Sequence, residues 1–196
     1  MPDYCIFILR FLLFAAAHSF FAANRVKGVI GRLCHGEPRG YRLVYNLFSF
    51  ALFGWVMAAY TASTVLYFAP GVWSLVMYLA QLVCGVMLAD CLRRTGAGDF
   101  LGIRQLRRVH NGPQQLVTSG YYAIVRHPLY LLSIVFLLLN PVMTDRWLLL
   151  TALSTLYFGI GGLIEERRLL TEFGDQYRLY RKRVPFIIPR LVSHGK

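Results

Sequence analysis

Long apolar runs alternate with short basic segments along the chain. Three of the runs, residues 4–23, 41–69 and 72–92, have the roughly 20 residues with which an α-helix crosses the hydrocarbon layer of a membrane. Two more begin at Pro128 and at Trp147. Pro128 suits the first turn of a helix, because a backbone N–H is not needed there. The pattern predicts an all-α integral membrane protein with about five transmembrane helices.

The fourth run is shorter than the others. It starts at Pro128 and meets Asn140 and Pro141 after only twelve positions, whereas the fifth covers residues 147–164. A helix that crosses the membrane here must continue past Pro141 with a kink, or else it reaches only part of the way. Either arrangement predicts a short helical hairpin between the fourth and fifth runs.

The composition narrows the class of protein further. Apolar residues make up 57% of the chain and charged residues 15%, which is not typical of a soluble domain. The net charge of +12 belongs to basic residues between the apolar runs, not to one face of a soluble fold, so nucleic acid is not the expected partner. We expect a single membrane-embedded domain over residues 1–196, with membrane lipid around it.

Lysine and arginine are distributed unevenly among the connections. Residues 24–42 hold five of them, residues 93–126 six and residues 167–196 eight, whereas the connections near Pro70 and Asn140 hold only Arg146. Since cytoplasmic loops are enriched in Lys and Arg, five spans place the N-terminus outside and the C-terminus in the cytoplasm. The host membrane is then a bacterial inner membrane or the endoplasmic reticulum.

The N-terminal run and the cysteines have simple interpretations. The first run follows Asp3 instead of lysines and is interrupted by Arg10, so we interpret it as a retained helix and not as a signal peptide. The four cysteines form no Cys-x-x-Cys pair. Neither a disulfide framework nor a metal site is therefore expected.

The segment before the fourth run carries the first candidate chemistry. Arg126 offers a planar fork for a carboxylate, His127 a hydrogen-bond donor or acceptor, and Tyr122 and Tyr130 offer aromatic surfaces with hydroxyl groups. The helix that begins at Pro128 adds free backbone N–H groups at its N-terminus. This combination suits a zwitterionic aromatic ligand, although the same residues also suit an anchor among lipid headgroups.

Two adjacent carboxylates, Glu165 and Glu166, end the fifth run. Charges at the end of a membrane helix are costly unless they are paired. They can pair with nearby arginines or receive an ammonium group, which would complete a site for an amino acid moiety. Beyond them, four apolar residues at helical spacing predict an amphipathic helix that covers the site: Leu169, Phe173, Tyr177 and Tyr180.

These positions together resemble a known family. The matching residues are Gly120-Tyr121-Tyr122, Arg126-His127-Pro128-Leu129-Tyr130, Glu165-Glu166, Leu169, Phe173-Gly174, Tyr177, Tyr180 and Arg183-Val184-Pro185. They are similar to the C-terminal signature of membrane methyltransferases related to isoprenylcysteine carboxyl methyltransferase. Phospholipid methyltransferases, membrane thiol S-methyltransferases and NnrU-like proteins share the wider resemblance, which covers roughly the last eighty residues.

The resemblance implies transfer of a methyl group from S-adenosylmethionine, with residues 118–189 as the cofactor-binding half. The cofactor contacts that it implies are Tyr122, Arg126, His127, Pro128, Tyr130, Glu165 and Glu166. Leu132 departs from the pattern, because relatives often carry glycine or another small residue there. The departure concerns how closely the fourth helix approaches the cofactor.

The methyl acceptor depends on weaker signals. The stretch from Asp99 to Gln105 and the pair His18-Ser19 resemble the thiol S-methyltransferase and NnrU-like branches, so a small or lipophilic thiol is the expected acceptor. Candidate catalytic residues are His18, His110 and Arg104, although His18 also suits a hydrogen bond between helices and His110 a solvated loop. Carboxyl O-methylation of a prenylated substrate, phospholipid N-methylation and a non-catalytic membrane role remain alternatives.

Overall fold

The computed structural model describes residues 2–36, 38–59, 63–96, 98 and 115–190. The chain divides into two compact units, one formed by Met1–Thr64 with Gly96–Gly112 and the other by Val65–Thr95 with Pro113–Lys196. Both are built mainly of helices, in agreement with the sequence pattern. Each unit is described by itself below.

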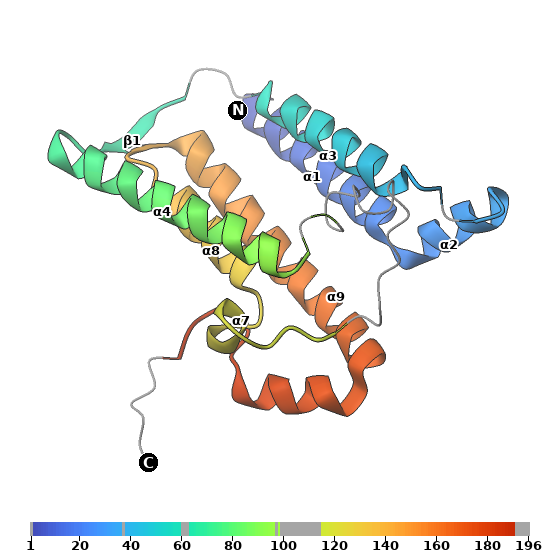
Figure 1. Cartoon of the computed structure of the whole chain (residues 1–196). Helices are drawn as coiled ribbons and strands as arrows, with labels where there is room; N and C mark the ends of the chain where they lie inside the picture. The colour runs from blue at the N-terminus through green and yellow to red at the C-terminus, as the bar shows by residue number, and fades with distance from the viewer. Residues whose placement is uncertain (1, 37, 60–62, 97, 99–114, 191–196) are drawn as a thin grey trace, which may run out of the picture. The chain divides into compact units, whose positions relative to one another are not determined.

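The described part of the first unit contains two long helices that pack together. Helix α1 (Pro2–Ala22) lies beside α3 (Tyr41–Met57), as Figure 1 shows. Phe7, Phe11 and Val56 are almost completely buried in this unit. Arg10 donates a hydrogen bond of 2.9 Å to the carbonyl of Trp55 and lies over its ring, so its charge is held against α3.

A third helix, α2 (Asn24–Leu33), occupies the connection after α1. From the sequence, this segment is expected only to be a basic connection, so the helix was not predicted. Ala23 has extended backbone angles, which end α1 and allow the chain to change direction before α2 begins (Figure 1). None of the α2 residues is buried.

The expected second helix, residues 41–69, is too long in the prediction. α3 ends at Met57, and residues Val65–Phe68, near the end of the apolar run, form strand β1. Thr64 and Val65 are β-branched, which disfavours a helix, and the backbone of β1 pairs antiparallel with β2 (Val142–Thr144). The run is therefore divided into a helix and a strand. This small sheet was not predicted.

Three packed helices make up most of the described part of the second unit. α4 (Val72–Arg94) packs against α8 (Pro128–Leu138), and α8 packs against α9 (Asp145–Arg183). Two hydrogen bonds to backbone carbonyls hold α4 on α8, from Cys84 to Leu132 over 3.1 Å and from Gln81 to Phe136 over 3.0 Å. A short helix, α7 (Tyr121–Ile124), precedes α8.

Helix α8 starts at Pro128 as predicted and stops before Asn140. The helix does not continue past Pro141 with a kink, which was one of the two alternatives for the fourth run. The indole of Trp147 donates a 2.8 Å hydrogen bond to the carbonyl of Leu137, which satisfies one of the carbonyls at the helix end. The chain then enters β2, and the Thr144 hydroxyl caps the first turn of α9.

Helix α9 runs well beyond the expected end at residue 164. It continues to Arg183 but is interrupted at Gly174, which has φ 52° and ψ −124°. That conformation is accessible to glycine and strained for other residues. The chain turns sharply there, so that residues 175–183 form a separate helical segment at the end of α9 (Figure 1).

The turn changes how the predicted amphipathic face is used. Gly174 separates Leu169 and Phe173 from Tyr177 and Tyr180, so the four side chains do not form one continuous helical face. Instead, Tyr177 and Tyr180 are buried and pack against the preceding part of α9. The prediction of a single apolar stripe was therefore wrong, because glycine allows the helix to fold back on itself.

Three of the described helices are long and apolar enough to cross a membrane: α1 from Asp3, α4, and α9. Large apolar side chains such as Leu12, Leu82 and Leu156 are more than half exposed on them, as expected for helices surrounded by lipid. α3 and α8 are shorter, with 17 and 11 residues. The structure thus supports a membrane protein with three candidate spans in the described residues, and it does not reach the predicted number of about five.

Candidate functional site

The site lies where the start of α8 meets the end of α9. Residues 125–127 are not helical, which leaves the backbone N–H groups of Arg126 and His127 available for other partners. They donate to the carbonyls of Pro185 and Phe186 over 2.9 and 3.1 Å. Two segments about sixty residues apart in the sequence are thereby joined through their backbones.

The Arg126 side chain extends this connection. Its Nε donates to Glu166 Oε1 over 2.6 Å, and its Nη1 donates to the carbonyls of Arg181 and Val184 over 3.1 and 2.5 Å. Both side chains of the ion pair are at least nine-tenths buried. A charged pair this far from solvent persists only when its geometry and its additional hydrogen bonds are good, as they are here. Arg126 therefore fixes the end of α9 above the start of α8.

His127 lies between the two glutamates. Its Nδ1 is 3.5 Å from Glu165 Oε2, and its Nε2 is 3.6 Å from Glu166 Oε1. Tyr130, one turn further along α8, donates a 2.9 Å hydrogen bond to the same Oε2 of Glu165. His127 is buried, whereas the Glu165 side chain is 36% exposed. Glu165 is therefore the carboxylate of this cluster that a ligand can reach.

An aromatic layer borders the charged residues. The rings of His127 and Tyr130 are nearly parallel at 5.2 Å, and Tyr130 stacks in turn on Phe158 of α9 at 5.2 Å. Phe186 meets His127 edge-to-face at 4.7 Å. Gly162 makes room for it, because a Cβ there would lie 2.7 Å from Cζ of Phe186. The cluster thus combines carboxylates with stacked aromatic surfaces.

Tyr122 and Tyr180 attach α7 to the end of α9. The hydroxyl of Tyr180 donates a 2.6 Å hydrogen bond to the backbone carbonyl of Tyr122. Burial raises the pKa of Tyr122 well above its usual value. The bond from Tyr180 therefore ties the backbone of α7 to the last segment of α9.

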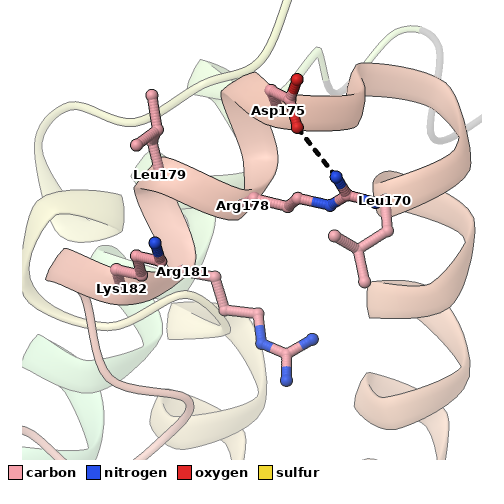
Figure 2. Close-up of a pocket in the computed structure, with 6 residues that line it drawn as sticks. All are labelled: Leu170, Asp175, Arg178, Leu179, Arg181 and Lys182. Carbon is pink, nitrogen blue, oxygen red and sulfur yellow. Dashed lines mark hydrogen bonds and ion pairs between the residues drawn. The ribbon is translucent and has the colours of Figure 1, made fainter.

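A surface pocket adjoins the cluster. Figure 2 shows its lining from the last part of α9: Leu170, Asp175, Arg178, Leu179, Arg181 and Lys182. Asp175 binds Arg178 over 2.9 Å. Arg181 belongs to both places, because its Nε lies 3.7 Å from Glu166 Oε2. The basic pocket and the buried carboxylate are therefore linked through one side chain.

The structure brings together most of the residues that the sequence singled out. Direct contacts join Arg126, His127, Tyr130, Glu165 and Glu166. Pro128 begins α8 beside them, and Tyr122 is connected to α9 through its carbonyl. That these residues contact a cofactor stays a prediction.

The candidate catalytic residues are not among the described residues that form this cluster. His110 and Arg104, with the motif from Asp99 to Gln105, lie outside the described residues. His18 belongs to the first unit, where it is hydrogen-bonded to Tyr45 and Ser49 of α3. This contact corresponds to the structural alternative considered for His18.

Sequence reasoning missed Phe158, Phe186 and the double role of Arg181. Apolar aromatic residues in an apolar helix carry no sign of a site, so Phe158 gave no signal. Phe186 follows directly on the Arg183-Val184-Pro185 motif and could have been noticed there.

The site offers three kinds of group that can bind a ligand. A reachable carboxylate can bind an ammonium group, the N–H groups at the start of α8 favour an anion, and the aromatic rings suit a flat or apolar group. Those are the parts of an amino acid attached to an aromatic ring system. The site is thus suited to a zwitterionic ligand of that kind.

The chain is similar to one known family and to several named methyltransferases. The family model described as NnrU protein matches residues 6–168. The chain is 46% identical over 77 residues to methanethiol S-methyltransferase 1 of Bradyrhizobium diazoefficiens, covering 39% of this chain and 27% of that protein. It is 39% identical over 102 residues to methanethiol S-methyltransferase 2 of the same organism, covering 50% and 39%.

A third relative has a different acceptor in its name. The protein-S-isoprenylcysteine O-methyltransferase of Xenopus laevis is 31% identical over 147 residues, covering 71% of this chain and 49% of that protein. The matches thus span between about a quarter and a half of the length of these three relatives. No solved structure matches the chain.

Proposed function

The chain belongs to the NnrU protein family, and from its similarity to proteins named as methyltransferases we propose that it is an integral membrane methyltransferase that uses S-adenosylmethionine and methylates a thiol. The relatives named as methanethiol S-methyltransferases, at 32–46% identity, support the reaction class and favour sulfur as the acceptor atom. The acceptor is a small or lipophilic thiol that reaches the site from water or from the membrane.

One observation carries the proposal: the reachable Glu165 accepts a hydrogen bond from Tyr130 and lies 3.5 Å from His127, whose other ring nitrogen is 3.6 Å from Glu166 of the buried Arg126–Glu166 pair. Glu165 would bind the ammonium group of the cofactor, and the start of α8 at Pro128 would favour its carboxylate. The aromatic layer suits its purine ring. The residue types present therefore fit the cofactor.

Each predicted contact then has a distinct part. Glu165 and Tyr130 would touch the cofactor directly, and His127 would orient Glu165. Arg126 and Glu166 would line the site while they hold the end of α9 in place. Tyr122 and Pro128 would set the position of the start of α8. The segment of residues 175–186 would cover the cofactor and keep water from it.

The chemistry asks little of the protein beyond this placement. Bound S-adenosylmethionine supplies an electrophilic methyl group on a positively charged sulfur. The chain must hold a thiol in line with that group and favour its thiolate form. His18, His110 and Arg104 remain our candidates for contact with the acceptor or its proton. A cationic Arg104 would stabilise a thiolate, and a histidine would accept the proton.

A second acceptor class has specific support. The relative from Xenopus laevis is named for O-methylation of isoprenylcysteine, and its match covers the larger part of this chain. Such an acceptor would enter between the helices from the lipid. Phospholipid N-methylation would use the same route. We place the thiol first because several relatives carry it in their names.

The membrane arrangement is also part of the proposal. The lysine and arginine distribution favours an N-terminus outside and a C-terminus in the cytoplasm, in a bacterial inner membrane or the endoplasmic reticulum. The end of α9, with five basic residues between 178 and 190, would then face the cytoplasm, from which S-adenosylmethionine comes.

Calorimetric binding of S-adenosylmethionine and S-adenosylhomocysteine to the detergent-purified protein tests the proposal. We expect Glu165→Gln to weaken binding roughly 10- to 100-fold, because a charged hydrogen bond contributes about 1.5 to 3 kcal/mol. Glu172→Gln is the matched control, since Glu172 is exposed on the same helix and belongs to no contact of the cluster. Small thiols are then offered as acceptors and the methylated products measured.

Two results would contradict the proposal. Equal affinity in Glu165→Gln and Glu172→Gln would remove Glu165 from the cofactor site. A well-folded wild-type protein that binds neither cofactor would turn the interpretation towards the non-catalytic membrane role.

A further inference from the structure

Helix α2 has a surface that the proposed function does not use. Val26, Val29, Ile30 and Leu33 occupy positions i, i+3, i+4 and i+7, so they form a single stripe along the helix. Val29 is 45% exposed and Leu33 75% exposed. Val26 and Ile30 are half-buried, and among the residues that the structure describes nothing buries Val29 or Leu33, so the exposed part of the stripe is open to a covering partner.

The basic residues of α2 flank the apolar stripe. At about 100° per residue, Arg25 and Arg32 lie on one border of the stripe and Lys27 on the other, while Gly28 and Gly31 occupy the opposite face. The helix contains no acidic residue. Long basic side chains at such a border can reach upward to phosphate groups while their stems stay against apolar surface.

The position of α2 in the chain restricts what can cover the stripe. It follows α1, a helix long and apolar enough to cross a membrane, after the single residue Ala23. With so short a connection, α2 must begin close to the level at which α1 leaves the hydrocarbon layer. It also turns away from the direction of α1 instead of prolonging it (Figure 1).

We propose that α2 lies in the membrane interface, with its apolar stripe among the acyl chains and with Arg25 and Arg32 on the headgroups of anionic phospholipids. Anionic headgroups complement the charge of the helix, and the bilayer surface complements its stripe. The proposal is independent of the methyltransferase function, since α2 contains no residue of the candidate site.

Fluorescence quenching on the full-length protein tests this surface. A fluorophore is attached at Leu33→Cys, on the stripe, or at Gly28→Cys, on the opposite face, after the four native cysteines have been replaced by serine. Both positions have room, because Leu33 is exposed and a Cβ at Gly28 would meet no atom within 4 Å. The protein is placed in nanodiscs of phosphatidylcholine, alone or mixed equally with phosphatidylglycerol.

For a helix lying in the interface, we expect nitroxide-bearing lipid to quench the label at position 33 at least about twofold more than the label at position 28. Acrylamide, a quencher in water, should give the opposite order. Phosphatidylglycerol should increase the lipid quenching at position 33. Arg25→Gln with Arg32→Gln should remove that increase.

Two outcomes overturn the proposal. Equal access of acrylamide to both positions would mean that α2 is surrounded by water. Shielding of position 33 from both quenchers would mean that protein covers the stripe. Hydrogen exchange on the unsubstituted chain gives an independent measurement. In that experiment the amides of residues 26–33 should exchange several-fold more slowly when phosphatidylglycerol is present. Equal exchange rates with and without phosphatidylglycerol would count against the proposal.

Discussion

Each of the two units holds polar side chains among apolar helices. The partners of these side chains differ between the units. In the first unit, His18 contacts two uncharged side chains, Tyr45 at 2.8 Å and Ser49 at 3.0 Å. In the second unit, Arg126 and Glu166 form a charged pair whose surroundings include the reachable Glu165.

The difference indicates which of the two is suited to a ligand. The His18 group joins two adjacent helices by neutral hydrogen bonds, which is sufficient to hold them together. The charged cluster takes its residues from three separate segments and leaves a carboxylate partly open. Charges that are expensive to bury are retained more readily where they have a function beyond packing. Four substitutions test this contrast.

The largest effect is expected for Arg126→Ala. The change leaves Glu166 buried without its main partner and removes the bonds to the carbonyls of Arg181 and Val184. Breaking such a pair costs about 3 to 5 kcal/mol. Thermal unfolding in detergent should show this loss, and limited proteolysis should cut the end of α9 faster.

Arg178→Ala is the matched control for that change. Its ion pair with Asp175 is exposed, so the expected loss is below about 1 kcal/mol. If Arg126→Ala and Arg178→Ala had the same small effect, the buried pair would not hold the site together.

The next effect concerns Gly162→Ala. The added methyl group would lie 2.7 Å from the Phe186 ring, which is held against His127. We expect a loss of about 1 to 2 kcal/mol and weaker binding of S-adenosylhomocysteine, because the ring must leave its place. Unfolding and calorimetry measure the two effects.

Gly159→Ala serves as control on the same helix, since a methyl group there would meet no atom within 4 Å. Alanine is the better helix former, so this variant should be as stable as wild type or up to about 1 kcal/mol more stable. A similar loss in both variants would mean that the backbone of α9, and not the fit of Phe186, is sensitive.

His18→Ala tests the other side of the contrast. We expect about 1 to 2 kcal/mol of lost stability, since hydrogen bonds between membrane helices contribute on average about 0.6 kcal/mol each. Cofactor affinity should stay unchanged. Loss of turnover in a variant of full stability would instead place His18 at the acceptor.

The smallest effect is expected for Tyr180→Phe. It removes the hydrogen bond to the Tyr122 carbonyl and should cost about 1 kcal/mol. Tyr78→Phe, at an exposed position of α4, should cost less than half of that. Equal melting temperatures for the two variants would show that the attachment of α7 does not depend on this bond.

The sequence predicted the parts of the fold that depend on local pattern. The apolar runs placed α1, α4 and the start of α8, because burial in lipid is read directly from hydropathy. β1 escaped prediction because its stability comes from pairing with β2, some seventy residues away. The turn at Gly174 escaped as well, since a glycine in a helical pattern is compatible with either a straight or a broken helix.

In the candidate site, too, the residue types could be predicted from the local sequence, whereas their contacts could not. The motifs with Arg126 and Glu165 identified the charged residues, but not which partner each would choose. From the sequence, Glu166 could pair with any of several arginines. The fold shows that its close partner is Arg126. Phe186 and Phe158 enter the site through packing, which no spacing of residues revealed.

The backbone bridge from Arg126 and His127 to Pro185 and Phe186 also sets an order of events during synthesis. The ribosome completes α8 before it has made either Glu166 or the carbonyls that Arg126 needs. Arg126 must therefore stay in contact with water or with the insertion machinery until about sixty more residues have emerged. The charged half of the molecule matures last, and a chain that stops before Glu166 leaves Arg126 without its carboxylate partner and without the carbonyls of Arg181 and Val184.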